Sequence, residues 1–224
     1  MRRVKLALLG IAAVILTALA VPAAHAAATP AAAPTASQLL AKANHCMVVS
    51  KSKYKTDDET SATVNICQSG SAYVWKADMD VDCDGVASSV CNSSTDPWYQ
   101  GQTSFPTSKG KSFTASTTHY YVIPLPSSKF SYKTAGIKPG TVAAIVYQNK
   151  VLYAVFADEG PSNIIGEASY ATARDLGIDP DPENGGTDSG VTYIVLKGNV
   201  PSPVEDNATI TAKGRSAAAA WLNS

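Results

Sequence analysis

Two apolar runs separated by a short polar turn constrain the fold of this chain more than any other feature. Residues 141–147 and 151–157 are rich in Val and Ala, and only Gln148, Asn149 and Lys150 separate them. Short apolar runs joined by such a turn are typical of a β-hairpin whose strands are buried. A hairpin of this kind needs further strands around it, so the sequence predicts a β core.

Shorter patterns extend this core. Strands are predicted at residues 62–67, 72–77, 119–123 and 191–196, and helices at 37–44, 168–176 and 208–222. Residues 87–118 are rich in Ser, Thr, Gly, Pro and Asn. That composition predicts a long irregular loop, and such loops often carry binding function. The predicted fold class is mainly β with a few short helices and long loops.

The N-terminal residues 1–26 have the features of a secretory signal peptide. Arg2, Arg3 and Lys5 precede an apolar stretch at residues 6–21, and Ala24-His25-Ala26 supplies small residues for cleavage. A retained N-terminal anchor is the alternative. Residues 27–36 contain only Ala, Thr and Pro, which predicts a disordered lead-in. We therefore expect one folded domain at residues 37–224, secreted and free of the membrane once the signal is removed.

The four cysteines are expected to form two disulfides, because an even number in a secreted chain favours a disulfide framework. Three pairings are open. We favour Cys83–Cys91, which closes a short loop, and Cys46–Cys67, which ties the N-terminal helix to the first strand. A zinc site is disfavoured because the chain has no C-x-x-C spacing, so no metal is expected.

The charge balance limits the class of partner. The chain has 18 basic and 18 acidic residues, and the predicted signal removes three basic ones, which leaves a mature charge of −3. Nucleic-acid binding normally needs a basic face, so a nucleic-acid partner is not expected. A cationic substrate is compatible with this charge. Nothing in the sequence indicates an obligate oligomer, so we expect a monomer.

Two carboxylates beside a tight turn are the strongest candidates for chemistry. Asp158 follows a strand, Gly160-Pro161 makes a turn, and Glu167 comes nine residues after Asp158, before a predicted helix. Glycosidic bond hydrolysis needs one carboxylic acid to protonate the leaving oxygen, and a second carboxylate to activate water or attack carbon. The alternative is that Asp158 caps the turn and Glu167 caps the helix, because both residue types often do so.

A second acidic motif covers residues 78–85, where Asp78, Asp80, Asp82 and Asp84 alternate with other residues before a glycine. We expect an acidic loop here. The motif resembles the first half of an EF-hand, but Cys91 stands where the closing acidic residue belongs. Three interpretations stay open: calcium binding in another geometry, binding of a polycation, and a disulfide-stapled turn with solvated charges.

A serine hydrolase is disfavoured. His45 and Asp188-Ser189-Gly190 occur in the order of a trypsin-like enzyme, but His45 lies in a predicted helix close to the start of the fold. The serine segment lacks its second glycine, and the chain has no G-x-S-x-G motif.

Two resemblances add to this reading. Asp158-Glu159-Gly160-Pro161, with a short helix and Leu176-Gly177 after it, resembles a signature of double-psi β-barrels, which implies a six-stranded barrel. Residues 75–85, with Asp158-Glu159-Gly160-Pro161 and Ile165-Gly166-Glu167-Ala168-Ser169, look like the glycoside hydrolase family 75 chitosanases.

The family resemblance implies a secreted, endo-acting, inverting enzyme that cleaves β-1,4 glucosamine linkages in chitosan without a cofactor. It places the catalytic carboxylates on Asp158 and Glu167. Glu159 departs from the family pattern, where a small or hydroxylated residue is expected. By analogy with double-psi glycosidases Asp158 is the general acid and Glu167 the base, and the reverse assignment stays open.

The acidic motif then has a role without metal, because carboxylates can pair with glucosamine ammonium groups. The expected substrate-binding residues are Asp78, Asp80 and Asp82, with Trp75 and Tyr121 to stack on sugar rings. Two further classes of protein stay open. One is a non-catalytic polysaccharide-binding double-psi module, and the other is a calcium-stabilised structural protein.

Overall fold

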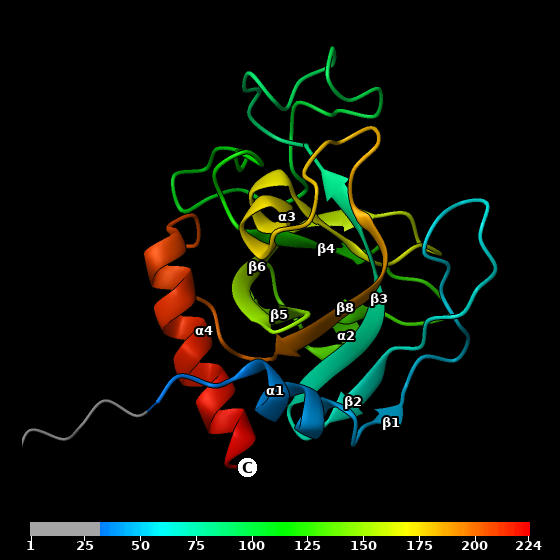
Figure 1. Ribbon diagram of the computed structural model, residues 1–224, viewed down its shortest axis with the longest axis vertical. Coiled ribbons are helices and arrows are strands. Elements are labelled where there is room, and N and C mark those ends of the chain that lie inside the picture. The colour runs from blue at the N-terminus through cyan, green and yellow to red at the C-terminus, as the bar shows by residue number, and fades with distance from the viewer. Residues whose placement is uncertain (1–31) are drawn as a thin grey trace, which may run out of the picture. The chain divides into compact units, whose positions relative to one another are not determined.

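The structure is a computed structural model that describes residues 32–224 (Figure 1). The predicted signal peptide and half of the lead-in lie outside these residues. The strands are β1 (Met47–Val48), β2 (Cys67–Ser69), β3 (Ala72–Asp82), β4 (Tyr120–Pro124), β5 (Val142–Tyr147), β6 (Lys150–Gly160), β7 (Glu167–Ser169) and β8 (Thr187–Leu196). The helices are α1 (Ala36–Ala43), α2 (Tyr132–Ala135), α3 (Tyr170–Leu176) and α4 (Asn207–Leu222).

Six of the strands close into a barrel. They follow the order β3-β7-β4-β6-β5-β8, and β8 pairs back onto β3 to complete the ring. The pairs β3–β7 and β4–β6 are parallel, whereas the other pairs of the ring are antiparallel. This confirms the predicted mainly β fold, with a six-stranded double-psi-like barrel, long loops and a few short helices.

The hairpin β5–β6 contributes to both hydrophobic clusters of the core. Val142, Ala144 and Val146 of β5 belong to one buried hydrophobic cluster, and Ala143 and Ile145 belong to a second. Successive side chains of a strand point to opposite faces, so β5 is covered on both. This explains why its sequence is a continuous apolar run rather than an alternation.

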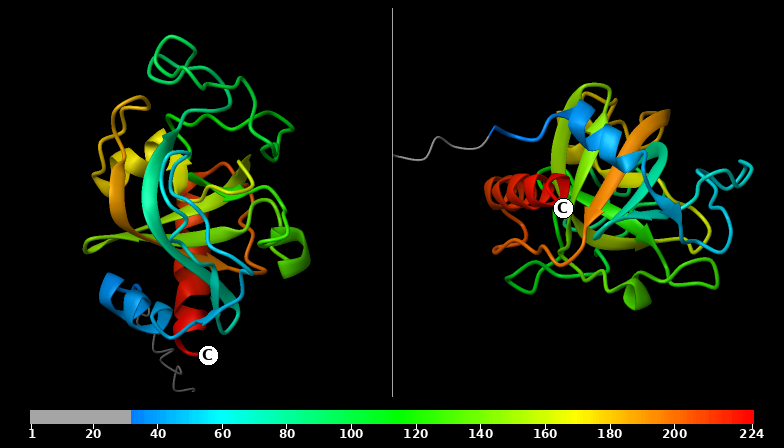
Figure 2. Two further views of the ribbon diagram at one scale, coloured as in Figure 1. Left: turned by 90° about the vertical axis from the view of Figure 1, so that its right-hand side faces the viewer. Right: turned by 90° about the horizontal axis from the view of Figure 1, so that it is seen from below.

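Helix α4 packs on the outside of the barrel, and α1 lies against the C-terminal end of α4 (Figures 1 and 2). Gly214 lies inside α4, where glycine is normally unfavourable. A Cβ atom at this position would lie 2.2 Å from the ring of Tyr153 on β6. Glycine therefore lets the helix approach the barrel closely. Near the end of α4, the Trp221 indole donates a hydrogen bond to the carbonyl of Ser69 in β2 at 2.8 Å.

Several predicted boundaries are corrected. Residues 62–66 form only an isolated bridge between Val64 and Tyr54, and the strand begins at Cys67. The expected acidic loop is largely a strand, because β3 continues to Asp82. Residues 167–169 form β7, so the following helix starts at Tyr170. The short helix α2 was not predicted.

The cysteines pair as favoured from the sequence, Cys46 with Cys67 and Cys83 with Cys91. Across residues 32–224, no helix combines the length and the apolar character needed to cross a membrane.

Candidate active site

One end of the barrel opens into an acidic cleft of about 800 Å³. The cleft lies between the end of β3, the end of β6, the start of β7 and three loops. Eleven acidic side chains line it, and no Lys, Arg or His of the described chain does: Asp57, Asp58, Asp80, Asp82, Asp84, Asp96, Asp158, Glu159, Glu167, Asp181 and Glu183. We call these residues the acidic cleft. More than half of the 18 acidic residues of the chain are gathered here.

Parallel pairing of β3 with β7 brings Glu167 into the cleft. Asp80 of β3 is in register with Glu167 of β7, and the Asp80 amide donates to the carbonyl of Gly166 at 2.8 Å. Gly166 has a φ of 123°, and a Cβ there would lie 1.8 Å from the Asp78 carboxylate. Only glycine fits this conformation without strain. The close approach of the two strands therefore depends on Gly166.

Asp158 lies near the end of β6 and is 5% exposed. Its Oδ1 accepts three hydrogen bonds: from the Ser104 amide at 2.9 Å, the Ser104 hydroxyl at 2.5 Å and the Glu159 amide at 2.8 Å. Its Oδ2 is buried and has no hydrogen-bond partner within the described chain. Burial raises the pKa of Asp158 above its ordinary value, while these hydrogen bonds act in the opposite direction.

The other carboxyls of the cleft raise one another's proton affinity. Burial, together with repulsion from Asp80 and Asp158, raises the pKa of Glu167 to about 8. Asp82 is 5% exposed, and burial together with the charges of Glu167 and Asp158 raises its pKa well above the ordinary value. Burial raises the pKa of Asp84 to about 6. The cleft can thus hold protons on carboxyl groups near neutral pH, as general acid catalysis requires.

Asp82, Asp84 and Asp158 form the tightest group of carboxyls. Each offers an oxygen within 4.8 Å of the others. Oxygen ligands in such a group suit a hard divalent cation. The same spacing suits shared protons or the ammonium groups of a ligand, because each of these relieves the repulsion between the carboxylates.

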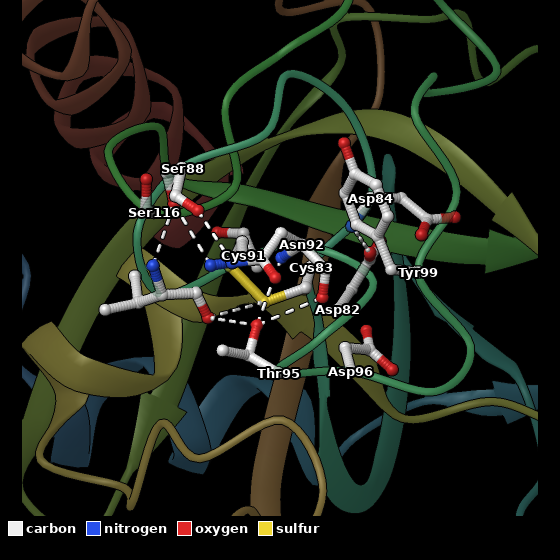
Figure 3. Close-up of a disulfide and its surroundings, with 12 residues drawn as sticks. Asp82, Cys83, Asp84, Ser88, Cys91, Asn92, Thr95, Asp96, Tyr99 and Ser116 are labelled. Carbon is white, nitrogen blue, oxygen red and sulfur yellow. Dashed lines mark hydrogen bonds between the residues drawn. A yellow bond between two sulfur atoms is a disulfide. The ribbon is translucent and has the colours of Figure 1, made fainter.

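The Cys83–Cys91 disulfide closes the first turns of the long loop at residues 83–118, directly after β3 (Figure 3). Carboxylates of the cleft hold two further turns of this loop. Asp84 accepts from the Gln100 amide at 2.6 Å, and Asp96 accepts from the Trp98 amide at 2.8 Å. The Trp98 side chain lines the cleft and is 86% exposed. It offers an open aromatic face of the kind on which sugar rings stack.

The structure separates the predicted substrate-binding residues. Asp80 is exposed in the cleft, and Asp82 lies deeper in it. Asp78 is buried beside Gly166 and does not line the cleft. This corrects its predicted role, and a β-bulge in β3 at this position explains the change of direction.

The two predicted aromatic residues are also placed elsewhere. Trp75 is 1% exposed and stacks on Tyr193 at 5.4 Å, and Tyr121 is fully buried with its hydroxyl bonded to the Thr141 carbonyl. Both rings are core residues, so neither presents a face to a sugar. Of the three Trp side chains, only Trp98 lines the cleft.

Several cleft residues were not predicted from the sequence. Asp57-Asp58 and the segment Asp181-Pro182-Glu183 lie on separate loops that the barrel brings to the same rim. Their only local signal is a pair of acidic residues in a loop, which is common on any surface. Glu159, the departure from the family pattern, lines the cleft and accepts a hydrogen bond from the Tyr132 hydroxyl.

Comparisons with known proteins identify relatives of this chain. A family model described as fungal chitosanase of glycosyl hydrolase group 75 matches residues 79–223. Endo-chitosanase B of Aspergillus oryzae is 30% identical over 160 residues, 67% of this chain and 65% of that protein. Endo-chitosanase C of Aspergillus oryzae is 33% identical over 135 residues, 58% of this chain and 33% of that protein. An endo-chitosanase of Aspergillus fumigatus is 33% identical over 101 residues, 42% of each chain.

The chain spans less than two thirds of the length of these relatives. The family model, however, matches well over half of the chain, and its match contains the end of β3, all of β6 and β7, and most of the acidic cleft. The chain therefore belongs to glycoside hydrolase family 75.

Proposed function

We propose that this protein is an endo-chitosanase that hydrolyses β-1,4 glucosamine linkages in chitosan, with Asp158 and Glu167 as its catalytic pair. The observation that carries the proposal is the acidic cleft, in which eleven carboxyl side chains surround this pair and no basic side chain of the described residues takes part. Chitosan is a polycation below the pKa of its amines. A cleft lined by one sign of charge concentrates a ligand of the opposite sign.

The acidic residues divide into two groups by position. Asp158 and Glu167 have restricted solvent access, and their pKa values are raised. Asp57, Asp58 and Asp80 are exposed, as are Asp181 and Glu183. Exposed carboxylates can reach ammonium groups along the polymer, whereas the less accessible pair suits proton transfer. The exposed Trp98 ring suits stacking on one sugar of the chain.

The proposed reaction inverts the configuration of the sugar. One carboxyl of the pair gives its proton to the bridging oxygen as the glycosidic bond breaks. The other takes a proton from a water molecule that attacks the anomeric carbon from the opposite face. No metal or other cofactor is needed for these steps. We propose that the enzyme acts as a secreted monomer, and its two disulfides support an oxidising compartment.

The test measures soluble oligomers released from highly deacetylated chitosan by the mature protein and by Asp158→Asn and Glu167→Gln. Each substitution is expected to lower kcat by about 10²–10⁴-fold, because it removes acid or base assistance. Glu205→Gln is the control, because Glu205 is a carboxylate outside the cleft. Proton NMR of the first products is expected to show the α-anomer.

Three outcomes would count against the proposal. Activity that survives both cleft substitutions would mean that other carboxylates carry the reaction. A β-anomer as first product would replace inversion with retention. Chitosan binding by the unmodified protein without any cleavage would make it a polysaccharide-binding module.

A further inference from the structure

The side chain that contacts Asp158 most closely comes from the long loop rather than from the barrel. Ser104 donates to Asp158 Oδ1 twice, from its backbone amide at 2.9 Å and from its hydroxyl at 2.5 Å. The Glu159 amide donates to the same Oδ1 at 2.8 Å and to the Ser104 Oγ at 3.1 Å. Ser104 Oγ thus accepts a hydrogen bond from the Glu159 amide and donates one to Asp158 Oδ1, which fixes the direction of the hydroxyl proton.

The segment around Ser104 is held firmly against β6. The Phe105 amide donates to the Ala157 carbonyl at 3.1 Å, and the Phe105 ring packs edge-on against Phe156 at 5.0 Å. Thr103 Oγ1 donates to the Phe105 carbonyl at 2.9 Å and accepts from the Phe113 amide at 3.1 Å. Ser104 is therefore fixed by its neighbours on both sides, although its own side chain is near solvent.

This arrangement makes the two oxygens of Asp158 unequal. Oδ1 accepts three hydrogen bonds from N–H and O–H donors, which favours negative charge on that oxygen. A proton on Asp158 then resides on Oδ2, which is buried and has no partner among residues 32–224. Oδ2 is therefore the oxygen that remains for a reacting group.

We infer that Ser104 is a positioning residue for Asp158: its hydroxyl orients the carboxyl so that Oδ2 is the reacting oxygen and sets the proton affinity of that group. Ser104 does not line the cleft, so it acts on the reaction only through Asp158. The inference rests on the proposed function, in which Asp158 is one of the two catalytic carboxyls. It adds a residue from the loop, 54 positions away along the chain, to the machinery of the pair.

The chain contains a matched control for this interaction. Ser108 donates to Glu205 Oε2 from its amide at 3.0 Å and to Glu205 Oε1 from its hydroxyl at 2.6 Å. This is also a two-point contact between a serine and a carboxylate, although it uses both carboxylate oxygens rather than one. Ser108 belongs to the same loop as Ser104, Glu205 precedes α4, and neither residue lines the cleft. Ser108→Ala removes an equivalent hydroxyl without touching the catalytic pair.

The experiment compares the dependence of kcat/KM on pH for the unmodified protein, Ser104→Ala and Ser108→Ala, with a glucosamine oligomer as substrate. Loss of a donor to the ionised carboxyl raises the pKa of Asp158. The limb of the pH profile that Asp158 controls is expected to shift to higher pH by about one unit. We expect kcat to fall about 10–100-fold and KM to change little, because misplacement of a reacting group affects the chemical step.

The limb that moves also gives the role of Asp158. Movement of the alkaline limb identifies it as the general acid, and movement of the acidic limb identifies it as the base. Ser104→Thr keeps a hydroxyl and is expected to restore much of the activity. If Ser104→Ala does not fold, Ser104→Cys replaces it, because a thiol of similar size is only a weak donor. Ser108→Ala is expected to leave both limbs unchanged.

The inference would be overturned if the pH profile of Ser104→Ala or Ser104→Cys were unshifted and kcat were unchanged. A lower Tm as the only effect would mean that Ser104 is a structural contact. Asp158→Asn, measured beside them, separates this from a failure of the proposed function. If Asp158→Asn is inactive and the Ser104 variants are unshifted, only the positioning role is wrong. If Asp158→Asn retains full activity, the catalytic pair itself is wrong.

Discussion

Glu167 retains a proton at neutral pH because its carboxyl is partly buried among other carboxyls, and this has a cost for folding. Its pKa rises to about 8 in the folded protein from an ordinary value of 4.5. Between these two values the folded state binds more protons than the unfolded state. The free energy of unfolding therefore decreases as pH rises through this range. The contribution of Glu167 is fully present below about pH 4.5 and is lost above about pH 8.

Glu167→Gln is expected to raise Tm at pH 8, where it removes a charge from a repulsive site, and to leave Tm nearly unchanged at pH 4. Differential scanning calorimetry at both pH values measures the effect. Glu205→Gln is the control with the opposite sign. Against the effect of burial, hydrogen bonds from Ser108 lower the pKa of Glu205, so its charge stabilises the fold above the ordinary pKa. A Glu167→Gln protein that is less stable at pH 8 than the unmodified protein would contradict this account.

At the scale of secondary structure, elements with local signals were predicted from the sequence and elements made by distant pairing were not. The β5–β6 hairpin has continuous apolar strands and a short turn, and both signals are local. The extension of β3 through Asp78, Asp80 and Asp82 was missed because acidic residues are rare in strands. Pairing with β8 and β7 holds these residues in a strand.

Strand β7 shows the same limit at the active site. Glu167, Ala168 and Ser169 are too few to form a recognisable pattern, and their partners in β3 lie more than 80 residues away. The sequence placed Glu167 before a helix, whereas the structure places it on a strand. In the same way, the burial of Trp75 and Tyr121 depends on the elements that cover their strands. The spacing of these two residues in the sequence does not reveal those elements.

The loop at residues 83–118 is an element whose function depends on its anchor. The double substitution Cys83→Ala with Cys91→Ala is expected to lower kcat/KM for chitosan, because the loop carries Asp84 and Trp98 to the cleft and brings Ser104 to Asp158. Loss of either disulfide typically costs about 2–5 kcal/mol. Assays well below the lower Tm therefore separate activity from stability.

Cys46→Ala with Cys67→Ala serves as the comparison. This disulfide joins the segment after α1 to β2, away from the cleft. We expect a similar fall in Tm and little change in kcat/KM. Equal activity in the two double variants would show that the loop keeps its position without its disulfide.

At the scale of the whole molecule, the acidic cleft is assembled from six parts of the chain, three strand ends and three loops. Its members range from Asp57 to Glu183, and only the barrel topology brings them to one end. The sequence identified Asp158 and Glu167 through their short separation and their family resemblance. It did not indicate the rim residues Asp57, Asp58, Asp181 and Glu183, because no local pattern records which loops meet.

A field produced by so many carboxylates predicts strong dependence on salt. Raising the ionic strength from about 0.05 M to about 0.5 M shortens the screening length from more than 10 Å to less than 8 Å. We expect KM for chitosan to rise several-fold over this range while kcat changes little. Steady-state kinetics at a pH where the polymer stays charged measures both constants.

The rim residues provide the control for this experiment. Asp181→Asn with Glu183→Gln is expected to raise KM at low salt and to reduce its dependence on ionic strength. If KM does not change with salt in either protein, the carboxylates of the cleft do not attract the polymer through their charge.

The concentration of acidic residues at one end leaves the rest of the molecule basic. Outside the cleft, residues 32–224 contain fifteen lysines and arginines and only seven acidic residues. The protein is therefore a strong electric dipole in spite of its small net charge. A field of this kind attracts a polycation at the mouth of the cleft more strongly than at the rest of the surface. Under the proposed function, we expect it to turn the protein toward its polymer before contact.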